Sequence, residues 1–383
     1  PGHAGAAERL GGEGGLDVIT LPDGRRVVRG EVLIGLKEGM PLARFKALLA
    51  QVNGEVVQSI PSLGVYRIRI PQDASVVGTA DLLKQFADVA LAEPNGVVEL
   101  PRARPVAASG VETPRVATPS PPDANGVAVA VLDSGLSGEV DLGKSLTGAF
   151  DATNPEGVLV DGSGHGTQMA MIATRAIAPE GTTLDAQGVP TLAIRAFDEE
   201  GMTSNFSLMQ GIDYALENEA RVMSLSWGTP TDSEFLERSI GYAQEKGMVV
   251  LAAAGNEPSG EALYPAAYDG VVAVGALDGS GGVWSQSNYG SFLDVVAPGT
   301  ADFPVGHDGP PGAYAGTSIS TPWVARSMSQ YLTVYPQATN AQMMQAFEGA
   351  LEDVHAPGRD DRSGNGVFNE AAKIRFLRTP PKR

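Results

Sequence analysis

The sequence predicts an α/β fold in which a small α+β domain precedes a doubly wound, mostly parallel sheet. Two observations after residue 126 predict the sheet. Short and almost wholly apolar runs recur, at residues 127–133, 191–197, 221–227, 248–255 and 271–277. Stretches with helical periodicity lie between them, for example at 206–220 and 234–247. Apolar strands that alternate with helices are typical of a parallel sheet covered on both faces, which we expect over residues 127–383.

The first 30 residues are expected to form a flexible tail and a short hairpin. Residues 1–15 hold six glycines and few apolar side chains. Residues 17–28 carry short β-like runs on either side of Pro22-Asp23-Gly24, a sequence that favours a turn. The chain begins at Pro1 rather than at Met, so we expect that a signal peptide or an expression tag has been removed.

The pattern of residues 31–101 predicts a compact α+β domain. Helices are expected at 41–53, where Leu42, Phe45 and Leu48 share one face, and at 78–92. Strands are expected at 31–37, 55–60, 63–70 and 96–100. The resulting order β-α-β-β-α-β is that of the ferredoxin-like split unit. Residues 102–126 are rich in proline and lack periodicity, so they are expected to be an extended linker open to proteolysis.

The composition limits the partners of the chain. Lys and Arg number 27 against 45 Asp and Glu, a net charge of −18, which opposes binding to nucleic acid or to anionic membranes. No apolar run approaches the ~18 residues of a membrane span. Cysteine is absent, which excludes disulfides and thiolate metal sites.

Three polar segments fall where a doubly wound sheet binds ligands, beyond the carboxyl ends of its strands. They contain Asp133 at the end of an apolar run, His165 in the loop 161–167, and Ser318 in the segment 316–322. An Asp, a His and a Ser can form an acyl-transfer triad, because the His accepts the Ser proton and the Asp orients the imidazole. The glycines beside all three residues would let backbone and substrate approach closely.

Each segment alone has a simpler structural explanation. An Asp that ends a strand often caps a helix, a His in a glycine-rich loop is often structural, and Gly-Thr-Ser often caps a helix. The chain order Asp133, His165, Ser318 agrees with the local motifs, and this agreement favours the triad. The other histidines, His3, His307 and His355, lie outside any motif and are assigned no role.

Over about residues 126–374 the sequence resembles the subtilisin-like serine proteases, the subtilases. The motifs that carry the resemblance are VAVLDSG (129–135), GHGTQMA (164–170), VMSLSWG (222–228), AAAGNE (252–257), YPAAYDGVVAVGA (264–276), LDVVAPG (293–299), GTSISTP (316–322) and GNGVFNEAAKI (364–374). The resemblance implies that Asp133, His165 and Ser318 are the catalytic triad and that Asn256 is the oxyanion-hole side chain. It also implies a cis peptide between Tyr264 and Pro265.

Residues 31–101 resemble the inhibitor-type propeptide of the same family. The resemblance implies a domain that assists folding and blocks the cleft until it is cut off within the linker 102–126. By loose alignment we expect the cut near Ala107-Ala108, with Pro105 two residues before Ala107.

The resemblance also implies a cleft in which extended substrate pairs with two backbone edges. The implied substrate-binding residues are Gly201, Met202, Thr203, Ser224, Leu225, Ser226, Trp227, Ala252, Ala253, Ala254, Gly255, Leu263 and Ala266. Backbone pairing gives little sequence preference, so a broad specificity is expected. Leu263 stands where many relatives carry Gly, so it should shorten the primary pocket, which holds the side chain before the scissile bond, unless it rotates outward.

The implied chemistry requires no cofactor. Gln168 replaces the second His of the family motif, but that position is not part of the triad. The loop 174–181 is shorter than the calcium-binding loop of many relatives, so that strong calcium site is expected to be absent. Loops 197–201 and 358–365 carry acidic groups that could hold a hard cation, although a solvated turn is the simpler explanation, and metal ligands stay unknown.

Together these observations predict the secreted, monomeric proenzyme of a serine endopeptidase. Its expected partners are protein or peptide substrates and its own propeptide, with neither nucleic acid nor membrane among them. Two alternatives remain. A binding or inhibitory pseudoenzyme is disfavoured because all four catalytic positions are intact, and a sedolisin-type Ser-Glu-Asp peptidase is disfavoured by His165 in Gly-His-Gly-Thr.

Overall fold

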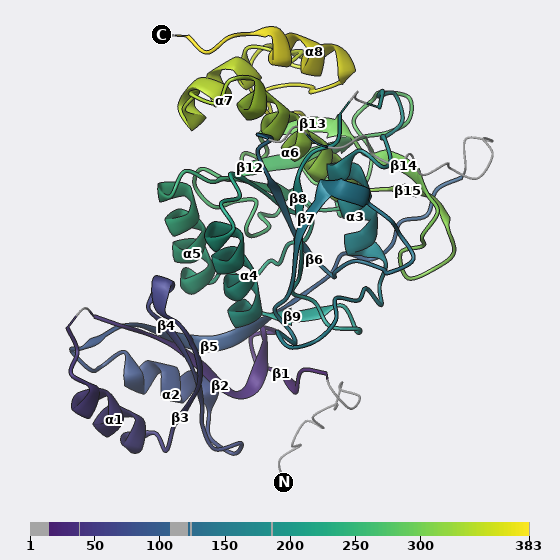
Figure 1. Ribbon diagram of the computed structural model, residues 1–383. Helices are drawn as coiled ribbons and strands as arrows, with labels where there is room; N and C mark the ends of the chain where they lie inside the picture. Colours follow the sequence, from purple (N-terminus) through teal and green to yellow (C-terminus); the bar gives the residue numbers. More distant parts are fainter. Residues whose placement is uncertain (1–14, 38, 108–121, 123–124, 185–186, 383) are drawn as a thin grey trace.

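The computed structural model describes residues 15–37, 39–107, 122, 125–184 and 187–382, which form two domains (Figure 1). The N-terminal domain extends from Val18 to Glu99, and the C-terminal domain begins at residue 125. The expected tail at residues 1–14 and most of the expected linker lie outside the described residues. Within the described residues, no helix is long and apolar enough to cross a membrane.

The N-terminal domain is a twisted antiparallel sheet with two helices on one face. Its strands are β1 (Val18–Thr20), β2 (Arg26–Leu36), β3 (Glu55–Ile60), β4 (Val65–Arg69) and β5 (Val89–Glu99), and its helices are α1 (Leu42–Gln51) and α2 (Val76–Leu83). The strand order is β3-β4-β2-β5, with β1 paired to β2. The predicted hairpin is confirmed, because Val18 pairs with Val28 across its turn. The order β-α-β-β-α-β from β2 to β5 is also as predicted.

The predicted helix over residues 78–92 is wrong in its second half. Helix α2 ends at Leu83, and β5 begins at Val89 rather than at residue 96. Ala92 and Leu91 pair with Ile34 and Gly35 of β2, which covers the domain core. Residues 86–92 have good local helix formers, but pairing with the long strand β2 overrides that local preference.

The C-terminal domain is built around a seven-stranded parallel sheet. Its strands are β6 (Val129–Asp133), β7 (Leu146–Asp151), β8 (Thr191–Arg195), β10 (Val222–Leu225), β11 (Val249–Ala253), β12 (Val272–Leu277) and β13 (Val295–Pro298). They lie in the order β13-β12-β11-β10-β6-β8-β7, and every pair is parallel. The five strands predicted from apolar runs are thus all present in one sheet, and the fold class is confirmed.

Helices cover both faces of this sheet. They are α3 (His165–Thr174), α4 (Asn205–Glu217), α5 (Glu234–Glu245), α6 (Thr317–Val334), α7 (Asn340–Glu348) and α8 (Glu370–Arg378). The short elements are β9 (Met202–Ser204) and the antiparallel pair β14 (Thr300–Phe303) and β15 (Gly312–Ala315). The peptide between Tyr264 and Pro265 is cis, as expected.

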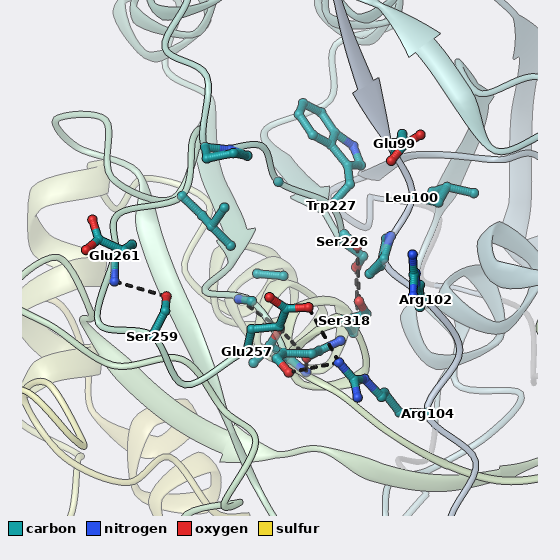
Figure 2. A pocket seen from close by; sticks show the side chains of 18 of the residues that line it. Glu99, Leu100, Arg102, Arg104, Ser226, Trp227, Glu257, Ser259, Glu261 and Ser318 are labelled. Carbon is teal, nitrogen blue, oxygen red and sulfur yellow. Dashed lines mark hydrogen bonds and ion pairs between the residues drawn. The ribbon is translucent and has the colours of Figure 1, made fainter. Parts of the chain in front are cut away.

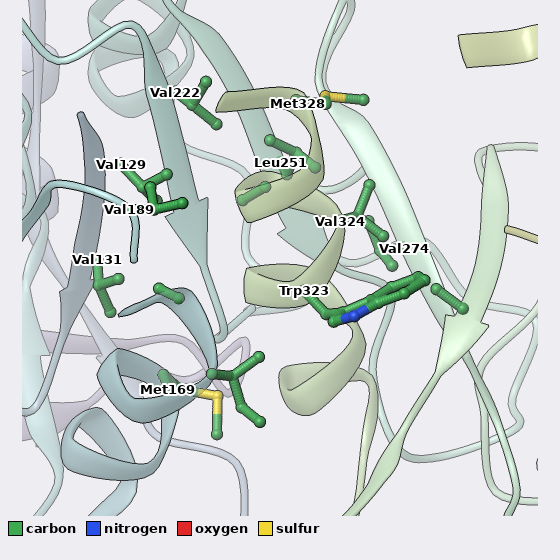
Figure 3. Close-up of a cluster of buried hydrophobic side chains, with 14 of the residues drawn as sticks. Val129, Val131, Met169, Val189, Val222, Leu251, Val274, Trp323, Val324 and Met328 are labelled. Atoms are coloured by element: carbon green, nitrogen blue, oxygen red, sulfur yellow. The ribbon is translucent and has the colours of Figure 1, made fainter. Parts of the chain in front are cut away.

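Helix α6 forms the centre of the main hydrophobic core. Figure 3 shows Trp323, Val324 and Met328 of this helix among Val222 and Leu251 of the sheet, and all five side chains are fully buried. Burial of each large apolar side chain contributes about 1.5–3 kcal/mol to stability. The core therefore fixes the first turn of α6, which carries Ser318, against the ends of the central strands.

The two domains share an apolar interface. Figure 1 shows the N-terminal sheet beside α4 and α5. Leu33 and Leu91 of that sheet pack with Phe206 and Met209 of α4 and with Phe235 of α5, and all are nearly or fully buried. The interface continues as a hydrogen-bonded sheet, because β5 pairs with β9 of the C-terminal domain. Because of this pairing, the chain that follows β5 runs toward the C-terminal edge of the parallel sheet.

Candidate active site

The structure brings Asp133 and His165 into direct contact. Asp133 ends the central strand β6, and His165 is the first residue of α3. The Nδ1 atom of His165 lies 2.7 Å from Oδ1 of Asp133, which also accepts a hydrogen bond from the Ser134 backbone N–H at 2.8 Å. The two side chains are only 2% and 1% exposed. This geometry fixes the orientation of the imidazole ring, and its Nε2 atom has no hydrogen-bond partner among the residues that the structure describes.

Glycine and Asp161 make the close approach of these two segments possible. A Cβ atom at Gly166 would lie 2.6 Å from the carbonyl oxygen of Gly135, so a side chain there would separate α3 from the turn after β6. Asp161 joins the same segments, because it accepts hydrogen bonds from the Ser134 hydroxyl and from the Gly164 and Thr167 backbone N–H groups, all at 2.8 Å. Asp161 begins the loop 161–167 that carries His165, but the sequence alone indicates no role for it.

Ser318 lies in the first turn of α6, beside the same strand ends. Its hydroxyl donates to the Ser226 carbonyl at 3.1 Å, and the Ser226 hydroxyl donates to the Ser318 carbonyl at 3.0 Å. Asn256 follows β11, and its side-chain oxygen accepts from the Thr317 backbone N–H at 2.9 Å and from the Thr317 hydroxyl at 3.0 Å. These contacts orient the Asn256 amide so that its nitrogen is left to donate next to the backbone N–H groups at the start of α6.

The charge distribution around His165 favours its protonated form. Burial alone would lower the pKa of His165, but the negative charge of Asp133 and its hydrogen bond act in the opposite direction. The carboxylates of Asp161 and Asp308 add to this effect. The net result is that the pKa of His165 is raised above its ordinary value.

A cavity of about 500 Å³ opens beside Ser318 (Figure 2). Its walls include Ser226, Trp227, Ala253, Gly255 and Leu263, all of which were expected to bind substrate. The Leu263 side chain points inward, because a Cβ atom at Gly255 would lie 2.4 Å from its Cδ1 atom. The bulky residue therefore lies against Gly255 in the wall of the cavity, and the outward rotation considered from the sequence does not occur.

Other residues expected to bind substrate lie elsewhere. Gly201, Met202 and Thr203 form the edge that pairs with the N-terminal domain. Four further residues are buried and are not among those that line this cavity, and their expected part in substrate binding stays a prediction; they are Ser224, Leu225, Ala252 and Ala266. Ala254 is likewise fully buried and absent from its walls. The sequence motif identified the right strands but could not tell which faces of them point into the sheet.

An extended segment of the chain itself crosses the cleft. The Leu100 N–H donates to the Gly201 carbonyl at 2.9 Å, and the Ala315 N–H donates to the Arg104 carbonyl at 3.0 Å. Pro101, Arg102 and Arg104 line a small space together with His165 and Ser318. Figure 2 shows Arg104 beside Glu257, whose carboxylate lies 3.8 Å from the Arg104 Nη2 atom. The same Nη2 atom lies 3.5 Å from the Asn256 carbonyl. Residues 101–104 therefore face Ser318 and His165.

This placement differs from the register expected near Ala107-Ala108. Pro105 already bridges Tyr314, and the Val106 N–H donates to the Ala313 carbonyl at 3.0 Å, so Ala107 lies beyond the catalytic candidates. Ala108 lies outside the described residues. The strand before the segment ends at Glu99, about where it was predicted, so the difference arises in the segment itself, where Arg104 and Val106 already pair with β15. The chain then needs fewer residues to reach Ser318 than the alignment allowed.

His307 is a site residue that the sequence analysis missed. Its ring centroid lies 4.6 Å from that of His165, and its side chain is only 6% exposed. It belongs to the loop between β14 and β15 and has no motif around it. No local signal could have placed it there, because the contact depends on how that loop folds back over α3.

A sequence model of the subtilase family matches residues 124–366. The chain belongs to the subtilase family. A model of the fervidolysin N-terminal prodomain matches residues 15–95, so the N-terminal domain of this subtilase is a prodomain. It begins before residue 31, the boundary expected from sequence, because the hairpin of β1 and β2 is part of its sheet.

Curated relatives and a solved structure agree with this family assignment. The subtilase is 30% identical to subtilisin NAT of Bacillus subtilis subsp. natto over 360 residues, 91% of each chain. It is 34% identical to subtilisin Savinase of Lederbergia lenta over 254 residues, 66% of this chain and 91% of that one. The structure of fervidolysin from Fervidobacterium pennivorans, a keratinolytic enzyme, matches with a TM-score of 0.75 at 22% identity. That match covers 98% of this chain and 65% of the fervidolysin chain, and it shows the shared fold.

The two acidic loops considered for a cation are organised by their own backbone. Asp360 accepts hydrogen bonds from the Arg362 and Ser363 N–H groups, and Asp198 accepts from the Glu200 and Met202 N–H groups. Across the part of the chain that the structure describes, no group of three His, Asp or Glu side chains is arranged to hold a metal ion.

Proposed function

We propose that this subtilase is the secreted proenzyme of a broad-specificity serine endopeptidase that works through Asp133, His165 and Ser318. The observation that supports the proposal best is the buried Asp133–His165 pair, whose free Nε2 atom shares a small space with Ser318. The chemistry needs no cofactor in this proposal, and the active species is a monomer.

In the proposed reaction the Ser318 hydroxyl attacks the carbonyl carbon of the scissile peptide, and its proton passes to Nε2 of His165. Asp133 holds Nδ1–H and stabilises the imidazolium that forms. The negative oxygen of the tetrahedral intermediate accepts hydrogen bonds from the Asn256 amide and the Ser318 backbone N–H at the positive end of α6. His165 then gives its proton to the leaving amine, and water releases the acyl group by the same steps.

The prodomain is proposed to inhibit the enzyme until it is cut off. Its last strand pairs with β9, and residues 101–104 occupy the space in front of Ser318 where a substrate would have to lie. Maturation then consists of a cut among these residues, upstream of the bond expected from sequence. The Ser318 hydroxyl is bonded to the Ser226 carbonyl here and would have to turn toward His165.

A fluorophosphonate probe tests the proposal directly. Such a probe reacts covalently with a serine that an adjacent base activates. We expect wild-type protein, once processed, to be labelled at Ser318 and nowhere else, as peptide mass spectrometry would show. The absence of labelling, in a protein that is folded and has lost its prodomain, would favour a pseudoenzyme.

The rate of hydrolysis should rise with pH through one transition above the ordinary histidine value of ~6.5. The pKa of His165 is raised in this structure, and only the neutral imidazole can accept the Ser318 proton. Activity is therefore lost as the pH falls through that raised value. Measurement of kcat/KM on a peptide substrate from pH 4 to 10 checks this, and an optimum below about pH 5 would contradict the mechanism.

Replacement of Leu263 should change which side chain the primary pocket accepts. Leu263→Gly removes a bulky side chain from the wall of the cavity, and kcat/KM for a peptide with Phe before the scissile bond should rise about 10-fold or more relative to the Ala peptide. The comparison uses two peptides that differ only at this position. The exposed Leu184→Gly serves as the matched control and should leave the ratio unchanged. An unchanged ratio in Leu263→Gly would mean that this side chain does not limit the pocket.

A further inference from the structure

His307 is a buried titratable group that the proposed reaction does not use. Its ring packs on that of His165 with a centroid separation of 4.6 Å and an interplanar angle of 54°. Its Nε2 atom is buried, with Asp308 as its nearest charged group at 3.3 Å. The loop that carries His307 is held in place, because the His307 backbone N–H donates to the Tyr314 hydroxyl. That hydroxyl in turn donates to the Pro310 carbonyl.

The groups that face His307 come from several elements. His165 of α3 lies against one face, and the ring of Tyr314 lies 6.3 Å away. The backbone of Pro101, in the segment that crosses the cleft, forms a hydrogen bond with the ring. Arg102 and Arg104 line the same small space. The carboxylates near the pair of imidazoles are Asp133 and Asp161, which together with Asp308 act on His165.

With residues 101–104 in the cleft, these surroundings keep His307 neutral near pH 7. Burial is the main cause that lowers its pKa to about 3, and the positive charge that His165 carries when protonated acts in the same direction. The Pro101 hydrogen bond acts in the opposite direction but is outweighed. A neutral ring can lie against the imidazolium of His165 without repelling it. A second cation at 4.6 Å would instead oppose protonation of His165.

We propose that His307 is a positioning residue that packs on the face of His165 and holds its ring in the plane of the hydrogen bond to Asp133. The Asp133 contact fixes one atom of the imidazole but still allows the ring to rotate about Cβ–Cγ or to swing away. A second ring in tilted contact removes that freedom and excludes water from one face. The inference rests on the proposed function, because it assigns His307 a task within that reaction.

The experiment compares three variants of the processed enzyme. His307→Phe keeps an aromatic ring that cannot be charged, and His307→Ala removes the ring. His355→Ala is the matched control, because it removes an exposed histidine from a loop outside the site. We expect kcat within about twofold of wild type for Phe and a 10- to 100-fold lower kcat for Ala, a range typical of a misplaced catalytic group. KM should stay within threefold in each.

The pH profile separates positioning from a general loss of structure. In His307→Ala water reaches the His165 ring, so burial opposes its charge less, and the acid limb of kcat/KM should move to higher pH. His307→Phe and His355→Ala should keep the wild-type limb. Thermal melting of each variant establishes that it is folded, and a folded Ala variant with wild-type kcat and acid limb overturns the inference.

The outcome is distinguishable from failure of the proposed function. If wild-type protein is not labelled at Ser318 by the fluorophosphonate probe, the proposed function is wrong. The role proposed for His307 is then wrong as well, because it rests on that function. If wild type labels and turns over substrate while His307→Phe loses activity as strongly as His307→Ala, the ring is not merely a packing surface. That result also overturns the proposal, since it would assign His307 a role that requires its nitrogen atoms.

Discussion

Ser318→Ala should abolish peptide hydrolysis and leave the prodomain attached. The substitution removes the only oxygen that His165 is proposed to activate, and no other hydroxyl in the small space around His165 comes from a serine or threonine. The change deletes one atom in the first turn of α6 and a bond to the Ser226 carbonyl, so stability should fall by about 1 kcal/mol or less. Mass spectrometry of purified protein over time should show one intact chain.

Ser327→Ala is the matched control for this variant. It removes another buried hydroxyl from the same helix, one that bonds to the Trp323 carbonyl on the preceding turn. We expect it to mature at the wild-type rate and to give a new N-terminus between residues 102 and 105. Turnover above a few percent of wild type in Ser318→Ala would contradict the role of Ser318. An N-terminus of the processed enzyme far from residues 101–107 would contradict the proposed place of the cut.

Asp133→Asn should lower kcat about 10⁴-fold while the enzyme stays folded, by analogy with the same change in other serine-protease triads. The amide keeps the shape of the carboxylate, but when its NH₂ group takes the place of Oδ1 it donates to Nδ1 of His165 and no longer accepts the Ser134 N–H. That contact favours the tautomer with the proton on Nε2, which cannot accept the Ser318 proton. Kinetics on a chromogenic peptide give the size of the loss.

The residual activity of Asp133→Asn should also have a different pH dependence. The charge of Asp133 is the leading cause that raises the pKa of His165, so its removal should shift the acid limb of activity to lower pH. The exposed Asp269→Asn serves as a control for the loss of one negative charge and should change neither rate nor profile. A loss smaller than tenfold would mean that Asp133 does not orient the base.

The sequence was sufficient for the parts of the structure that local patterns encode. The five apolar runs became parallel strands, and the residues directly after them, such as Asp133 and Asn256, met at one edge of the sheet because parallel strands share that edge. Ser318 could be placed because a glycine-rich turn leads into a long helix. Each of these features depends on residues that are close together in the sequence, so a local sequence motif is enough to predict it.

The features that escaped prediction depend on contacts between distant segments. Residues 89–92 joined a strand because β2 was available to pair with them, not because of their own preferences. His307 reached His165 because the loop from β14 to β15 folds over α3, and nothing in its own sequence marks it. The register in the cleft was missed because it depends on how residues 104–106 pair with the distant strand β15.

The segment that crosses the cleft is held on both sides of Ser318, through Leu100 to Gly201 and through Val106 to Ala313. A bond within it is therefore presented to the enzyme by its own chain, and its effective concentration is set by geometry rather than by the amount of protein. If the proposed self-cleavage occurs there, it is unimolecular, and its half-time should be the same in dilute and in concentrated solution. After the cut, both new chain ends stay hydrogen-bonded next to Ser318. The peptide bond between them can therefore form again until one of the two ends dissociates. In the proposed maturation we therefore expect the slow step to be the departure of the strand at residues 104–106 from β15, a separation of two paired backbones rather than a chemical step.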